Sequence, residues 1–123
     1  AATRIVKENR FAAIDSVVFV DLDDEIDGEL FFPLLPDADV IVVGRQKPGD
    51  PLTRLIKVRL GAAARSGATL HALRLRDLDA GYGGRWNAGS NKRGGGSRLS
   101  AEDYATYIAQ ALRDNAWGDR FET

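Results

Sequence analysis

Residues 81–98 limit how this chain can fold more than any other segment, because no helical or strand periodicity passes through them. The segment reads GYGGRWNAGSNKRGGGSR and holds seven of the chain's 13 glycines, four basic side chains and no acidic one. In compact domains, unstructured loops beyond about 12–15 residues are uncommon and are usually functional or disordered. We therefore expect a loop that binds a ligand, orders against another subunit or stays solvated.

The composition of this Gly-rich segment favours binding of a phosphate-bearing partner. Glycine lets a backbone approach a ligand closely and expose its N–H groups to an anion. Arginine and lysine neutralise phosphates, and aromatic rings stack on bases. The candidate ligand-binding side chains here are Arg85, Lys92, Arg93, Arg98, Tyr82 and Trp86. No phosphate-binding loop pattern of either common type is present.

The charge distribution along the chain points the same way. The net charge is only −1, but residues 51–100 carry a balance of +8, against −6 for residues 1–50 and −3 for residues 101–123. Such asymmetry is typical of a surface that faces a polyanion, although acidic and basic segments can also neutralise each other within one fold. Arg74 and Arg76 fall in the basic part and could extend its surface toward the Gly-rich segment.

Composition excludes several other classes of site. The chain has 123 residues, enough for one domain, with no cysteine and a single histidine, His71. Disulfides, cysteine zinc sites and thiol nucleophiles are thereby excluded, and most histidine metal sites with them. We predict no catalytic residues, no cofactor, no bound metal and no membrane partner, with a cytoplasmic location.

Apolar patterning predicts an α/β or α+β fold. Four segments have strand composition: 3–7, 12–22, 29–35 and 38–44. An Asp27–Gly28 turn predicts an N-terminal hairpin between the second and third of these, and the continuous apolar run 38–44 predicts a central strand covered on both faces. With one later strand, the prediction is a mixed sheet of four to five strands in a single domain, 1–123.

Two helices are predicted to cover this sheet. Asp50 and Pro51 resemble a helix N-cap and first turn ahead of a helix at 51–65, although Ile56, Val58 and Leu60 also alternate as in a strand. Residues 68–76 then read as a strand, which gives a strand–helix–strand crossover and places His71 on an apolar face. Ser100 and Asp103 predict a capped C-terminal helix over 100–116.

The loop Gly44–Asp50 is a further candidate ligand-binding segment. It follows the predicted central strand, and ligands of open α/β sheets bind beyond the carboxyl ends of their strands. Arg45 and Lys47 supply positive charge there. An ordinary strand-to-helix connection is the alternative.

Six carboxylates lie within residues 21–29, directly after an apolar strand. Residues 17–24, with Asp21 and Asp23 in an Asp-x-Asp pattern, resemble the first motif of haloacid dehalogenase-like phosphotransferases. That resemblance implies a nucleophile at Asp21, a general acid at Asp23 and Mg²⁺ between them. Glu25 departs from the Thr or Val of that family, and the later motifs cannot be placed. A solvated acidic turn is the alternative.

Three functions remain open from the sequence. The first is binding of a nucleic acid or nucleotide through the basic face of residues 51–100. The second is a structural role as a subunit of a homo-oligomer. The third is a metal-dependent phosphoryl-transfer enzyme or nuclease, and no complete catalytic constellation supports it.

Overall fold

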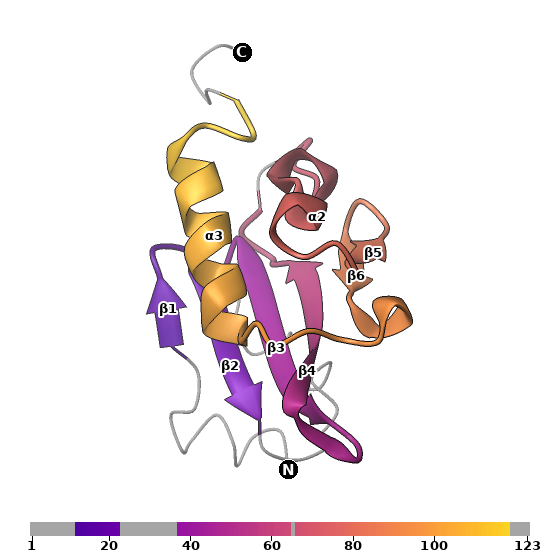
Figure 1. Ribbon diagram of the computed structural model, residues 1–123. Helices are drawn as coiled ribbons and strands as arrows, with labels where there is room; N and C mark the ends of the chain where they lie inside the picture. Colours follow the sequence, from indigo (N-terminus) through magenta and orange to yellow (C-terminus); the bar gives the residue numbers. More distant parts are fainter. Residues whose placement is uncertain (1–11, 23–36, 65, 119–123) are drawn as a thin grey trace.

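A computed structural model describes residues 12–22, 37–64 and 66–118 (Figure 1). Six strands of these residues form one sheet in the order β1-β2-β3-β4-β6-β5. Along the chain they are β1 (Ala12–Ile14), β2 (Val17–Leu22), β3 (Val40–Lys47), β4 (Asp50–Leu60), β5 (Gly83–Gly84) and β6 (Ala88–Ser90). The helices are η2 (His71–Leu73), α2 (Leu75–Leu78), η3 (Lys92–Gly94) and α3 (Ala101–Arg113).

The sheet is mixed, because β2 and β3 run parallel while every other neighbouring pair is antiparallel. Together with the C-terminal helix α3, this confirms the predicted α+β class. The sheet has six strands rather than four to five. Among the described residues, no helix combines the length and hydrophobicity needed to cross a bilayer.

Helix α3 lies along one face of the sheet and forms the core with it (Figure 1). Tyr104, Ala105 and Ile108 are fully buried against apolar side chains of β2, β3 and β4. Strand β3 is buried on both of its faces, since Val40 to Val43 are each at most 4% exposed. The continuous apolar run therefore marks a central strand, as predicted.

The predicted helix over 51–65 is wrong, because β4 occupies residues 50–60. β3 and β4 form an antiparallel hairpin in which Val42 lies opposite Val58. Ile56 and Val58 point into the core, whereas Lys57 and Arg59 alternate with them. The period of two decides the structure, since β-branched residues on a half-buried face favour a strand.

The hydrogen bonds of the Asp50 carboxylate explain why the sequence resembles a helix N-cap at this position. The carboxylate accepts hydrogen bonds from Leu52 N at 3.2 Å and Thr53 Oγ1 at 2.7 Å, as a helix cap would. Here these bonds close a turn instead, with Gly49 at a φ of 81°. The same local bonds serve caps and turns, so Asp followed by Pro does not distinguish them.

Two further predicted elements differ. Residues 68–76 contain η2 and the start of α2 rather than a strand, so the crossover through 51–65 is absent and the parallel pair is β2 with β3. His71 is consequently exposed rather than packed on an apolar face.

Segment 12–22 forms two strands, since Asp15 at a φ of 53° makes a turn between β1 and β2. The predicted strands at 3–7 and 29–35 lie outside the described residues.

The Gly-rich segment 81–98 is ordered. It contains β5, β6 and η3, and β6 pairs with β4 so that Gly89 lies opposite Val58. Ser97 and Arg54 form a further backbone bridge to β4. The segment therefore extends the sheet instead of forming the predicted loop.

Candidate functional site

A pocket of about 920 Å³ opens where β4 meets the Gly-rich segment, and we call it the basic pocket. Of the described residues that line it, five carry a positive charge and none is acidic. These cations are Lys57, Arg59, Arg76, Arg85 and Arg93. Cations gathered in a concave site without carboxylates concentrate positive potential there.

Four separate elements contribute these cations. Lys57 and Arg59 come from β4, where they alternate with the core residues Ile56 and Val58. Arg76 comes from α2, Arg85 from the β5–β6 turn and Arg93 from η3. The turn is closed by Arg85 N, which donates to Ala88 O at 2.7 Å. Residues far apart in sequence thus meet because β6 pairs with β4.

Close packing of backbone explains several of the glycines. A Cβ at Gly89 would collide with the ring of Tyr82, and one at Gly94 would collide with the backbone of Gly81. The segment therefore folds on itself with backbone against backbone, which only glycine permits. Glycines of this segment therefore form part of the pocket wall.

A buried carboxylate anchors both ends of the segment. Asp79 Oδ2 accepts hydrogen bonds from Tyr104 Oη at 2.6 Å, Ser97 Oγ at 2.9 Å and Asn91 Nδ2 at 3.0 Å. Its other oxygen accepts one from Gly81 N at 3.2 Å. Burial acts to raise the pKa of Asp79, but the hydrogen bonds from Tyr104, Asn91 and Ser97 outweigh it, so the pKa is lowered.

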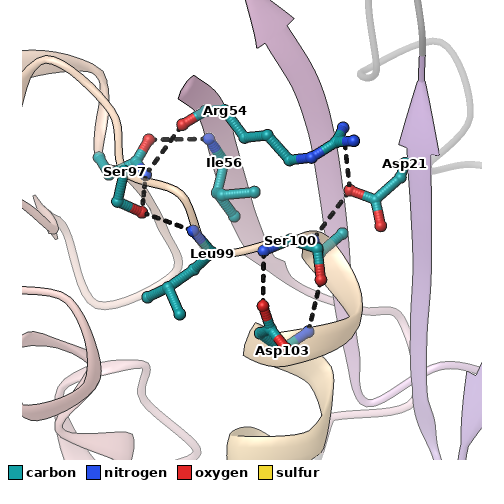
Figure 2. A network of polar contacts seen from close by, with 9 residues as sticks. Asp21, Arg54, Ile56, Ser97, Leu99, Ser100 and Asp103 are labelled. Carbon is teal, nitrogen blue, oxygen red and sulfur yellow. Dashed lines mark hydrogen bonds and ion pairs between the residues drawn. The ribbon is translucent and has the colours of Figure 1, made fainter. Parts of the chain in front are cut away.

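Asn91 continues this network into the sheet. It is fully buried, and its Oδ1 accepts a hydrogen bond from Ile56 N at 2.8 Å. Ser97 in turn exchanges backbone bonds with Arg54 (Figure 2). The Gly-rich segment is thereby tied to β4 and α3 by satisfied buried polar groups, which hold the wall of the pocket in one geometry.

The predicted site residues separate into two groups. Arg85 and Arg93 line the basic pocket, while Lys92 and Arg98 are exposed on the same segment but outside its lining. Trp86 is 54% exposed and lies in sequence between the lining residues Arg85 and Asn87. Its ring is available to stack on a flat ligand.

Tyr82 is too buried for the predicted stacking on a base. It is 8% exposed, its ring centroid is 6.4 Å from that of Tyr104, and burial raises its pKa to about 12. The ring is thus part of the core, and the hydroxyl is protonated at neutral pH. The Tyr82 hydroxyl is buried and has no hydrogen-bond partner among the described residues.

Arg45 and Lys47 do not line the basic pocket. Both lie at the end of β3, before a hairpin turn rather than a strand-to-helix loop. Lys47 Nζ donates a hydrogen bond to Gly95 O at 3.1 Å and so supports the Gly-rich segment from β3.

Lys57, Arg59 and the Asp79 network belong to the candidate site but were not among the site residues expected from the sequence. The alternation of Lys57 and Arg59 with Ile56 and Val58 was the available signal, and it was outweighed by the apparent helix cap at Asp50. No local signal identifies the Asp79 network, because its members come together only through the fold.

Asp21 belongs to a structural contact at the start of α3. Its Oδ1 accepts a hydrogen bond from Ala101 N at 2.9 Å and lies 3.6 Å from Arg54 Nη1 (Figure 2). Asp23 and the remaining carboxylates of the acidic turn lie outside the described residues. Within the described part of the chain, no group of three or more His, Cys, Asp or Glu side chains is placed to hold a metal.

The sequence matches no protein-family model and no curated protein. Among solved structures, the chain is similar to a pGpG-specific phosphodiesterase, PggH from Vibrio cholerae, with a TM-score of 0.59 and 18% sequence identity. The similarity covers 92% of this chain and 40% of that one. This chain therefore spans well under half the length of its structural neighbour, and at this identity the likeness concerns the fold.

Proposed function

We propose that this protein binds a phosphate-bearing ligand, a nucleotide or single-stranded nucleic acid, in the basic pocket. The observation that carries the proposal is the set of five cations around one concavity without an acidic neighbour among its described lining residues. Phosphate oxygens are the natural complement of clustered guanidinium groups, because each arginine offers a planar fork of donors.

Two further observations support this ligand class. The indole of Trp86 is exposed and follows the lining residue Arg85 in the sequence, and aromatic stacking is a common way to hold a base without reading its identity. The structural neighbour is described as specific for pGpG, a substrate of the proposed kind.

The test compares two double variants that remove the same charge from the same segment. Arg85→Ala with Arg93→Ala removes cations of the pocket, whereas Lys92→Ala with Arg98→Ala removes cations outside its lining. All four side chains are exposed, so neither variant should change thermal stability. Affinity is measured by fluorescence anisotropy of a short, labelled, 5′-phosphorylated single-stranded oligonucleotide at low salt.

The proposal predicts that the pocket variant loses at least about tenfold in affinity, which corresponds to one charge-assisted contact. The control variant should lose less than about threefold, as expected for a change in overall charge. Equal losses in both variants would place binding on the general surface of the segment. No binding by the wild-type protein would refute the proposal.

A further inference from the structure

A second, smaller pocket of about 450 Å³ adjoins the basic pocket, and we call it the side pocket. The two pockets share four wall residues, which are Arg76, Tyr82, Gly83 and Gly84. The side pocket is also lined by residues of η2 and α2, such as His71, and by Arg74 between these two helices. The short strand β5 therefore separates two adjoining concavities.

Gly83 has no packing or backbone reason to be a glycine. A Cβ at this position would meet nothing within 4 Å, and Gly83 is not among the glycines with a positive φ. Its neighbour Gly84 differs, since it has a φ of 156° and a Cβ there would collide with Gly89. Gly83 is exposed in the shared wall, so the missing side chain leaves bare backbone between the two pockets.

Beyond the shared Arg76, the lining of the side pocket adds one arginine, Arg74. Arg74 and Arg76 line it together with the imidazole of His71, and Asp77 is its acidic lining residue. Arg74 has a φ of 53°, a left-handed conformation that is unfavourable for a residue with a Cβ. Tyr107 Oη fixes this conformation by donating to Arg74 O at 2.9 Å.

The shared wall also contains a buried donor without a partner. Tyr82 is more than nine-tenths buried, and its hydroxyl has no hydrogen-bond partner among the described residues. Buried polar groups are nearly always satisfied, so an unsatisfied one at the boundary of two pockets is a feature to be explained. The hydroxyl has almost no accessible surface and lies beside Gly89, so it belongs to the wall itself and not to the open space of either pocket.

We propose that the side pocket is a second anion subsite and that the ligand crosses the bare backbone at Gly83. The protein then selects ligands with two phosphate groups over ligands with one, because only the former reach the cations of both pockets. This inference rests on the proposed function and adds the number of phosphate groups that the site recognises.

The test uses two probes, thymidine 5′-monophosphate and the 5′-phosphorylated thymidine dinucleotide, titrated by calorimetry at low salt. Gly83→Val places a side chain between the pockets, and its Cβ would meet no heavy atom within 4 Å. Arg74→Asn removes the side-pocket charge, and asparagine tolerates the left-handed conformation. Arg113→Asn is the matched control, because Arg113 pairs with Asp15 and lines neither pocket.

We expect wild-type protein to bind the dinucleotide at least about tenfold more tightly than the mononucleotide. Arg74→Asn changes a residue that lines only the side pocket, so it should weaken dinucleotide binding by about fivefold or more and leave mononucleotide binding unchanged. Gly83→Val changes the shared wall and should weaken dinucleotide binding by about fivefold more than mononucleotide binding. The control should change neither affinity, and thermal unfolding should show that all three variants are folded.

The inference is overturned if the two probes bind equally well, or if both variants leave the dinucleotide affinity intact or weaken both probes alike. In those cases binding in the basic pocket, and with it the proposed function, still stands. If the wild-type protein binds neither probe nor the oligonucleotide, the proposed function fails and the second subsite fails with it.

Discussion

At the scale of single residues, Asp79 connects the segments that form the basic pocket. Its carboxylate accepts hydrogen bonds from α3, from Asn91 just before η3 and from both ends of the Gly-rich segment. Because the carboxylate is buried, removal of a donor leaves an acceptor that water cannot easily reach. Stability and pocket geometry therefore depend on the same few atoms.

Tyr104→Phe should lower the free energy of unfolding by about 1.5–3 kcal/mol, the usual value of a hydrogen bond to a charged group. The hydroxyl of Tyr104 lies 2.6 Å from the Asp79 carboxylate, and burial together with this bond raises the Tyr104 pKa well above its ordinary value. Urea denaturation measures the change. Tyr107→Phe is the control, because Tyr107 bonds an exposed backbone oxygen and should cost less.

Because the pKa of Asp79 is lowered, the stability of the protein should vary with pH in the acid range. A carboxyl group whose pKa is lower in the folded state stabilises that state fully above its ordinary pKa of about 3.9. The contribution is lost as the pH falls through the lowered value. Wild-type protein should therefore lose stability below about pH 4 more steeply than Asp79→Asn, which is already destabilised at neutral pH. Identical acid slopes in urea denaturation would show that Asp79 is not the group responsible.

Trp86 provides a second residue-scale prediction. If its exposed indole stacks on a base, Trp86→Ala should weaken oligonucleotide binding by about 1–3 kcal/mol. The melting temperature should stay unchanged, because the side chain is 54% exposed. A loss of stability with unchanged affinity would assign the ring to packing instead.

At the scale of elements, the sequence predicts best where local signals agree with each other. The helix α3 is an example, since Ser100 and Asp103 form the predicted capping box and the apolar spacing of Tyr104 and Ile108 faces the core. Strand β3 is another, because a continuous apolar run has few alternatives. Both elements are specified by residues within their own segments.

The elements that were predicted wrongly are those in which local sequence signals conflict. In β4 the Asp50 carboxylate resembles a helix cap, while Ile56, Val58 and the cations between them follow a strand period. β4 pairs with β3 on one side and, at residues 57–59, with β6 on the other, and no local sequence pattern predicts these pairings. The strands of the Gly-rich segment could not be predicted for the same reason, since β6 pairs with β4 and β5 pairs with β6.

The cap of α3 can be tested directly. Ser100→Ala should lower the free energy of unfolding by about 0.5–2 kcal/mol, because the Ser100 hydroxyl accepts from Asp103 N at 3.0 Å. Glu102→Ala in the same turn is the control, since Glu102 is exposed and its side chain is outside the capping box. Equal effects of the two variants in chemical denaturation would contradict the capping assignment.

At the scale of the whole molecule, the charge layout of the sequence indicated the basic region but not the site. Residues 51–100 carry the positive balance, and the pocket cations all come from this part of the chain. The sequence could not separate Arg85 and Arg93, which line the pocket, from Lys92 and Arg98, which do not. That distinction depends on how the Gly-rich segment folds against β4.

Phosphate recognition by the pocket is the central claim, and the salt dependence of binding tests it most directly. For a single strand, the slope of log affinity against log salt is about −0.7 for each phosphate neutralised. We expect a steep slope for the wild-type protein between about 50 and 200 mM salt, measured by anisotropy with the same oligonucleotide. Arg85→Ala with Arg93→Ala should reduce its magnitude by about 1.4, and Lys92→Ala with Arg98→Ala should reduce it much less. A wild-type affinity that does not change with salt, or a slope that both variants reduce equally, would contradict the account.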